Sequence, residues 1–579
     1  MLPAFPIPLQ PWLLNKSLKV DAMRKLNTVI IISICLVHFS CKKSSSGDGP
    51  VPTPAPPVPF NLLSSSLNNQ PAAATTYNVN HTPVIQLNFS GKIDKNTVGG
   101  AVNFSSANGA VGYTTSYANN DSSLLIQPSV KLNPITNYNF TLSTALKSST
   151  GIAVTAGTNF KFLTHIDSSD KFPLITDTAL VQLVQQQTFK YFWDFGHPIS
   201  GLARERNTSG DLVTSGGSGF GVMAIITGIH RGFITKGQGL ARLQTMVSFL
   251  KNTAQRFHGA YPHWLNGATG VVIPFSAKDN GADLVETSYL IQGLLCARQY
   301  FNSSDPTEVA LRNDINSISN SVEWSWFRKS NENVLYWHWS PNFAWDMNVQ
   351  IRGWNESLIT YVLAASSPAF SIPKVVYDNG WAGNGAMRNN AIYYGYQLPL
   401  GPNLGGPLFF AHYSFLGINP FSLTDAYANY GTQNTNHTKI NYEYCKVNPK
   451  GWYGYSDQCW GLTASDIPGG YSASSPTNDL GVIAPTAALS SFPYTPAESM
   501  KALKFFYYKL GDKLWGEYGF KDAFKLSDPW FADSYLAIDQ GPIVVMMENY
   551  RSGLLWNLFM SCPEVKTGMT GLGFQSPHL

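Results

Sequence analysis

The first part of the chain alternates apolar and polar residues with a period of two. Residues 85–89 read Ile-Gln-Leu-Asn-Phe, residues 138–142 read Tyr-Asn-Phe-Thr-Leu, and Phe160 and Phe162 continue the pattern. This alternation is typical of half-buried strands, and clusters of Gly, Asn, Asp and Ser between the runs provide turns. We therefore predict a small all-β sandwich over residues 60–167.

From about residue 170 the apolar period changes to that of helices. Within residues 237–257, for example, Leu240, Leu243 and Leu250 fall on one apolar stripe. The predicted helices cover residues 177–193, 219–231, 237–257, 282–301, 306–327, 355–365, 480–490, 496–510 and 542–559. Helix pairs joined by long Gly-, Trp- and Tyr-rich loops predict a mainly α domain over residues 170–579, arranged as an (α/α) toroid. A superhelix of stacked helical repeats is the alternative, although the sequence has no fixed period.

Residues 1–41 have the features of an export signal. Two basic residues precede an apolar run at 28–39 that is too short to span a bilayer, and Cys41 follows. We expect Met23 to be the true start and Cys41 to be lipidated. An ordinary secretory signal with an incidental cysteine is the alternative.

A Ser/Gly-rich and then Pro-rich spacer at residues 42–59 follows the predicted signal. Such a segment is semi-extended and separates a folded domain from a membrane. We therefore expect an exported monomer whose membrane attachment is a lipid anchor at Cys41. Placement in the periplasm and placement on the outer-membrane surface both remain open.

Composition narrows the ligand class. Charged residues make up 13% of the chain, the formal net charge is +4, and Lys and Arg form no dense run. Nucleic acid is therefore not an expected partner, because tracking phosphates requires clustered positive charge. Fifteen Trp and 28 Tyr fit a neutral, hydroxyl-rich ligand such as a glucan, although aromatic residues also dominate ordinary cores.

The cysteines indicate no metal centre. No Cys-x-x-Cys pair and no histidine pair at ligand spacing occurs, so we predict no zinc site and no cofactor. Cys445 and Cys459 flank a Gly/Tyr-rich loop and could form a disulfide in an exported protein. Cys296, inside an apolar helical run, is predicted to be a buried thiol.

Three positions could supply the two carboxyl groups that glycoside hydrolysis requires. Asp283 and Glu286 are spaced to share one helical face, although the same spacing is that of a helix cap. Glu356 follows Trp354-Asn355, and an apolar ring nearby raises the pKa of a carboxyl group. Asp539 lies between apolar residues and Gly-Pro, where a simple N-cap is the alternative.

Aromatic and basic residues in the loops are candidates for substrate binding. They are Arg206, His263, Trp264, Trp337, His338, Trp354 and Tyr471. Histidine ring nitrogens donate readily to hydroxyl groups, but a single loop histidine is more often structural. Arg206, beside Glu205, could instead form a structural ion pair. The Gly-rich run at 216–221 matches no nucleotide-binding pattern and is expected to allow close helix packing.

Long strings in order through residues 189–574 resemble one family. They include PHWLNGATG at 262–270, DNGADLVETSYLIQGLL at 279–295, GWNESLITYVLAASSP at 353–368 and YLAIDQGPI at 535–543. These strings resemble the glucoamylase-like domain of glycoside hydrolase family 144, the bacterial endo-β-1,2-glucanases. The pattern at residues 83–97 resembles bacterial Ig-like modules that precede catalytic domains.

The resemblance implies an (α/α)6 toroid that hydrolyses β-1,2-glucan with inversion and without a metal. Glu356 occupies the Asn-Glu position of the family's general acid. Asp283, Glu286 and Asp539 match its other carboxylates, with Asp539 as the expected base. Some relatives act in exo fashion and release sophorose, so an exo-acting sophorose-releasing enzyme is one alternative, and a non-catalytic glucan-binding lipoprotein is another.

Overall fold

The computed structural model of the chain describes residues 56–579. The predicted export signal, with Cys41, and residues 42–55 of the predicted spacer lie outside the described residues. Over residues 56–579, no helix combines the length and the apolar character that crossing a membrane would require.

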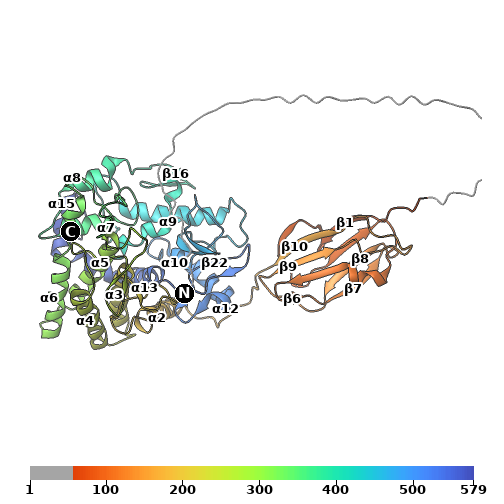
Figure 1. The fold of residues 1–579 in the computed structure, drawn as a ribbon, viewed down its shortest axis with the longest axis horizontal. Helices are drawn as coiled ribbons and strands as arrows, with labels where there is room; N and C mark the ends of the chain where they lie inside the picture. Colours follow the sequence, from red (N-terminus) through yellow and green to blue (C-terminus); the bar gives the residue numbers. More distant parts are fainter. Residues whose placement is uncertain (1–55) are drawn as a thin grey trace, which may run out of the picture. The chain divides into compact units, whose positions relative to one another are not determined.

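Two five-stranded sheets form the N-terminal β-rich region (Figure 1). One sheet has the order β2-β1-β4-β8-β7 and the other β3-β10-β9-β5-β6. The strands are β1 (Leu62–Leu67), β2 (Gln70–Pro71), β3 (Thr75–Val79), β4 (Ile85–Phe89), β5 (Val102–Ser106), β6 (Gly109–Ala110), β7 (Tyr113–Ala118), β8 (Ser123–Pro128), β9 (Asn137–Leu142) and β10 (Thr158–Thr164). All neighbouring strands pair antiparallel except β3 and β10. This confirms the small all-β region.

The period-two alternation of the sequence sets the faces of these strands. Ile85, Leu87 and Phe89 of β4 are buried, and the polar residues between them are half-exposed. The register places Ile85 opposite Ile126 and Leu87 opposite Leu124, so apolar side chains meet on one face. Phenylalanines from the second sheet complete one continuous core.

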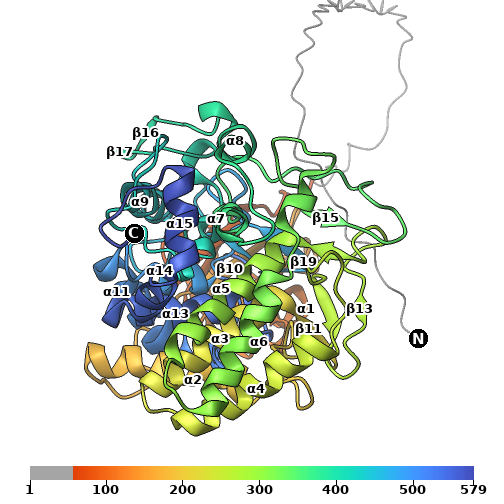
Figure 2. The ribbon, with the colours of Figure 1, turned by 90° about the vertical axis from the view of Figure 1, so that its left-hand side faces the viewer.

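The remainder of the described chain is rich in helices. The longer ones are α2 (Asp177–Trp193), α3 (Ser215–His230), α4 (Lys236–Asn252), α5 (Leu284–Tyr300), α6 (Pro306–Asn320), α7 (Leu358–Ser366), α9 (Tyr430–Val447), α11 (Pro496–Lys504), α13 (Ala537–Ser552), α14 (Leu554–Met560) and α15 (Pro563–Leu572). Helices α3, α5 and α13 are buried along nearly their whole length, whereas α4 and α6 each expose a polar face. In Figure 2 the first three lie toward the centre of the helical domain and α4 toward its edge. The domain therefore has inner and outer helices.

Glycines allow the inner helices α3 and α5 to approach each other closely. A Cβ atom on Gly219 would overlap the backbone of Tyr289 and Leu290, and one on Gly293 would overlap the backbone of Gly219. A Cβ on Gly217 would meet Ala537 at the start of α13. The predicted packing role of this Gly-rich run is confirmed.

Several helix boundaries differ from those predicted. The helix predicted to begin at Asn355 begins at Leu358, because the Asn355 side chain accepts the amide of Ser357 and forms a turn first. The helix predicted to open at Pro542 begins at Ala537, and it ends before Gly553, whose positive φ of 69° separates α13 from α14. Pro542 lies inside this helix, so the carbonyl oxygen of Ile538 lacks the N–H that residue 542 would otherwise donate.

Helix α9 was not predicted, because its sequence is too polar to show an apolar stripe. It buries polar side chains instead, and each finds a partner. Gln433 donates to and accepts from the backbone of Leu400, and Asn441 does the same with Leu462. Hydrogen bonds to loops therefore replace apolar packing on its inner face.

The cysteines of the helical domain are free thiols. Cys445 and Cys459 are both buried and unbridged, so the disulfide considered from the sequence is not formed in this structure. Cys296 is fully buried, as predicted.

Candidate active site

A two-residue sheet brings distant parts of the chain together at the start of α5. Strand β14 (Ala282–Asp283) pairs with β15 (His338–Trp339), and Asp283 lies opposite His338. The backbone N–H of Leu284 also donates to the carbonyl oxygen of Trp337 at 2.9 Å. This pairing, across more than fifty residues of sequence, fixes two of the predicted site residues side by side.

Asp283 is the N-cap of α5 and is completely buried. Its Oδ1 accepts the backbone N–H groups of Val285 and Glu286 at 3.0 and 2.9 Å. Its Oδ2 accepts from Nδ1 of His263 at 3.0 Å. Burial would raise the pKa of Asp283, but the hydrogen bond from His263 and the neighbouring charges lower it below its ordinary value. The capping alternative is thus correct for one oxygen, while the other faces two histidines.

The two histidines differ in charge at neutral pH: one is a cation and the other is neutral. Burial would lower the pKa of His263, but Glu286 and Asp283 raise it to about 9, so this ring is a cation. Burial lowers the pKa of His338 to about 4, and its Nε2 lies 3.6 Å from Asp279 and 3.7 Å from Asp283. His263 therefore balances the charge of Asp283, and His338 is a neutral polar group.

Glu286 connects the N-termini of α3 and α5. Its Oε2 accepts the backbone N–H of Gly216 at 3.0 Å and lies 3.4 Å from the hydroxyl of Thr214. A side chain at residue 216 would collide with this carboxylate, so glycine is required there. Burial raises the pKa of Glu286 in spite of these donors.

Glu356 lies just before α7, half-buried, at the same end of the inner helices. Ser414 and Tyr289 donate hydrogen bonds to its backbone carbonyl oxygen and hold the segment in place. Burial, followed by the charges of Glu286 and Asp283, raises the pKa of its carboxyl group to about 7, and no basic side chain is among the groups that shift it. A carboxyl group with this pKa can still hold its proton near neutral pH.

Asp539 lies in the first turn of α13 beside acidic residues that the sequence did not single out. It is 2% exposed, and burial and the neighbouring Asp522 raise its pKa. Asp466 also belongs to this acidic cluster. Arg206 forms an ion pair with Asp466 at 3.2 Å and another with Glu205 at 2.9 Å. Arg206 thus forms the structural ion pair considered from the sequence, and extends it to Asp466.

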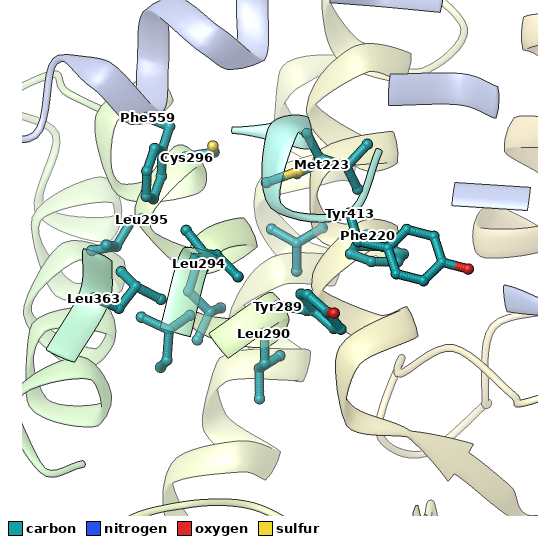
Figure 3. Close-up of a cluster of buried hydrophobic side chains, with 14 of the residues drawn as sticks. Phe220, Met223, Tyr289, Leu290, Leu294, Leu295, Cys296, Leu363, Tyr413 and Phe559 are labelled. Carbon is teal, nitrogen blue, oxygen red and sulfur yellow. The ribbon is translucent and has the colours of Figure 1, made fainter. Parts of the chain in front are cut away.

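Two tyrosines lie between the acidic groups. Burial raises the pKa of Tyr413, and the charges of both Asp539 and Glu356 raise it further. Tyr289 likewise experiences the charges of Glu356, Glu286 and Asp283. The two rings are 5.7 Å apart, and in Figure 3 they lie together with Phe220 at one end of the apolar cluster. The charges of both Glu356 and Asp539 therefore act on Tyr413.

The predicted aromatic binding residues divide into two groups. Trp264 and Trp337 are half-buried near the histidines, and Tyr471 is 44% exposed on β19 (Gly470–Ala473), opposite Asp466. Trp354 is 5% exposed and packs against Phe415 and Tyr430. Its ring packs in the core, and its contact with substrate stays a prediction.

Sequence reasoning missed several residues of the site. Phe275 is 43% exposed and lies 4.4 Å from the ring of His263 and 4.7 Å from that of Trp264. Asp279 is buried, its Oδ1 has no partner among the described residues, and burial and Asp283 raise its pKa to about 7. Asp279 lies within a string that resembles the family, whereas Phe275 lies outside the quoted strings and has no distinctive spacing.

His263, Asp279 and Asp283 also place possible metal-ligating atoms within 4.8 Å of one another. The hydrogen bond between His263 and Asp283 uses two of these atoms, so this pair is satisfied without a cation. A separate depression of about 450 Å³ is lined by Lys251, Arg256 and other residues outside the predicted site. The carboxyl groups, not this depression, therefore define the candidate site.

Acidic side chains thus converge at the N-terminal ends of inner helices, with one carboxyl group protonated near neutral pH and exposed aromatic rings beside them. This fold and site define a glycoside hydrolase, in which paired carboxyl groups act on a bond between sugars.

Comparison with known proteins gives the family. Residues 348–563 match the family described as "Putative glucoamylase", and residues 65–164 match the bacterial Ig-like domain. An endo-β-1,2-glucanase from Chitinophaga pinensis is 54% identical, with a TM-score of 0.69, and the match covers 70% of this chain and all of that one. A β-1,2-glucanase from Parabacteroides distasonis is 38% identical over 89% of this chain and 73% of that one, with a TM-score of 0.67. The chain belongs to this glucoamylase-like family, of the glycoside hydrolase family 144 type, and carries an Ig-like domain.

A curated relative has a different described action. The exo β-1,2-glucooligosaccharide sophorohydrolase of Parabacteroides distasonis is 47% identical over 425 residues, which is 69% of this chain. The matched part spans 58% of the length of that relative.

Proposed function

We propose that this protein hydrolyses β-1,2-glucan to short oligosaccharides by an inverting mechanism in an (α/α)6 toroid. The observation that carries the proposal is that two carboxyl groups from different helix ends, Glu356 and Asp539, both raise the pKa of the buried phenol of Tyr413. Support for the linkage comes from relatives described as β-1,2-glucan hydrolases at 38–54% identity. Support for the toroid comes from the inner and outer helices, with the acidic groups at inner-helix N-termini.

Glu356 acts as the general acid. Its carboxyl group donates a proton to the glycosidic oxygen as the bond to the anomeric carbon breaks. Asp539 acts as the base and removes a proton from the attacking water, which approaches the opposite face of the sugar. Asp283 and Glu286 are fixed by helix N-termini, and their charges keep the pKa of Glu356 high. His263, Asp279 and the exposed aromatic rings bind sugar hydroxyls and ring faces, and no step uses a metal.

A product assay on linear glucans of different linkage tests the function. We expect release of reducing ends from β-1,2-glucan, and no comparable release from β-1,3- or β-1,4-glucan. The first product from the β-linked chain is expected to be the α-anomer, as seen by NMR during the first turnovers. Activity confined to another linkage would contradict the proposal, and so would binding of β-1,2-glucan without any product.

Exo action is the second candidate, because the 47% identical relative is described as releasing sophorose from the non-reducing end. The time course of products separates the two modes. An endo enzyme gives a broad range of chain lengths early in the reaction, whereas an exo enzyme gives sophorose alone from the start. The structural relative at 54% identity is the reason for favouring endo action.

The pH dependence of kcat is expected to follow the proton on Glu356. Because the acid must be protonated to act, and its pKa is raised to about 7, kcat should fall as pH rises through about 7. A carboxyl group with an ordinary pKa would already lose its proton near pH 4. The measurement is kcat across the pH range at saturating glucan. A high-pH limb centred near 4 to 5 would contradict this role for Glu356.

We also propose that the protein is exported and anchored by a lipid on Cys41. The support is the basic and apolar pattern before this cysteine and the spacer after it. Cys41→Ser is expected to move the protein from the membrane fraction to the soluble fraction, with its glucan-hydrolysing activity unchanged. Equal membrane fractions for the wild type and the variant would overturn the anchor.

A further inference from the structure

We propose that Asp522 and Asp539 share a proton, and that Asp522 is a positioning residue acting through the catalytic base. This inference rests on the proposed function for the role of Asp539. The sharing of the proton itself depends on the arrangement of the two carboxyl groups alone, and it can be tested apart from catalysis.

The two carboxyl groups are buried and each has an oxygen that lacks a donor. Both residues are 2% exposed. Asp539 Oδ2 and Asp522 Oδ1 have no hydrogen-bond partner among the described residues when both groups are ionised. A proton on either group would allow a hydrogen bond between the two side chains, each of which shifts the pKa of the other. A single shared proton therefore satisfies two buried oxygens, each of which would otherwise cost free energy.

The rest of Asp522 is held in one orientation. Its Oδ2 accepts the backbone N–H of Asp466 at 2.7 Å, so Oδ1 is the oxygen left for the partner. Asp466 in turn accepts hydrogen bonds from Arg206 and from the hydroxyl of Ser534. Asp522 can therefore orient Asp539 in the way a backing carboxylate orients a catalytic group.

The surrounding charges favour a proton in the pair. Asp466 faces both carboxyl groups with a negative charge, and Arg206, which offsets it, is also paired with Glu205. The other titratable groups near Asp539 are the phenols of Tyr413 and Tyr471, neutral at physiological pH. Burial, and next the mutual repulsion of the carboxylates, raise the pKa of Asp522 to about 7 and that of Asp539 well above its ordinary value. Two adjacent buried carboxylates do not both ionise.

In the singly protonated pair, the shared proton leaves one carboxyl group ionised, so Asp539 is available as the base. During hydrolysis Asp539 takes one proton from the attacking water as the new C–O bond forms, and the pair changes from one proton to two. Glu356 gives one proton to the leaving oxygen as the old C–O bond breaks, so the proton count of the site is unchanged. The pair returns its extra proton, and Glu356 regains one, through solvent after the product leaves.

Infrared difference spectroscopy of the full chain tests the shared proton directly. The spectrum is recorded at about pH 8, above the pKa of about 7 for Asp522. At this pH the wild type should show the C=O stretching band of a protonated carboxylic acid. Asp522→Asn and Asp539→Asn should each lose the same band, and the double variant should lose no more. Asp479→Asn is the matched control and should keep the band, because this buried carboxyl group accepts hydrogen bonds from Tyr444 and Tyr455 and is not among the groups that shift the pKa of either aspartate.

Kinetics on β-1,2-glucan then test the positioning role. Asp522→Asn is expected to lower kcat by about 10–100-fold, as when a group that orients an active-site side chain is removed. Its low-pH limb should move to higher pH, because an amide is a weaker hydrogen-bond donor to the Asp539 carboxylate than a protonated Asp522 and stabilises the ionised base less. A merely structural role would not move this limb.

Three outcomes would overturn the shared proton: a band that survives both single variants, a band lost from only one of them, or losses that add in the double variant. An inactive wild type with the expected infrared pattern would contradict the proposed function but leave the pair intact. An active wild type without the band would reject the pair alone.

Discussion

Replacing Glu356 with glutamine is expected to lower kcat on β-1,2-glucan by about 10²–10⁴-fold, the usual contribution of a general acid. Glutamine has nearly the same shape and cannot donate the required proton. The Glu356 carboxyl group has no basic partner among the groups that shift its pKa, so the exchange breaks no ion pair with them. The measurement is reducing-end release at saturating substrate, together with the urea midpoint of unfolding.

Two comparisons make this result specific. Glu498→Gln is the matched control, because Glu498 also lies in the first turn of a helix, α11, and should keep full activity. A substrate with an activated phenol as leaving group needs little protonation, so on it Glu356→Gln should recover most of its rate. Retention of more than about a tenth of wild-type activity on glucan would remove Glu356 from the role of acid.

Gly219→Ala is expected to destabilise the helical domain by about 2 kcal/mol or more. The added Cβ would overlap the backbone of α5 at Tyr289 and Leu290, where no side chain can move aside. Overpacking of this kind costs about 1–3 kcal/mol, and the better helix propensity of alanine offsets only about 1 kcal/mol. The urea midpoint of unfolding measures the effect.

Gly237→Ala is the matched control for this substitution. Gly237 is also a helix glycine, in α4, and a Cβ there would meet nothing within 4 Å. Its free energy of unfolding should stay the same or rise by up to about 1 kcal/mol. Equal midpoints for the two variants would show that close approach of α3 and α5 does not require glycine at residue 219.

Sequence patterns predicted the helices and strands whose burial is visible in the local order of apolar and polar residues. The period-two strands around Ile85 and Phe140 and the long inner helices were found because burial on one face, or all round, is visible in the order of residues. Helix α9 was missed because its buried face is polar. The start of α13 was misplaced because Pro542 was interpreted as an opening residue, whereas the helix begins at Ala537 and contains this proline in its interior.

The site was predicted less completely, for a different reason. Asp283 and Glu286 are adjacent in sequence, and Glu356 and Asp539 were found from their flanking residues and the family resemblance. Asp522 and Phe275 have no such flanks, and their roles arise only from residues that lie near them after folding. Likewise, the sequence does not show which rings pack in the core, as Trp354 does against Phe415, and which are exposed.

The acidic groups of the site come from segments that span residues 283 to 539, and α13 supplies one of them only after it packs against α3. A chain that is still being synthesised therefore lacks the proposed base until Asp539 in α13 has emerged. Hydrolytic activity is therefore expected only after the whole helical domain has folded. A fragment that ends before α13 should be inactive even where its own helices form.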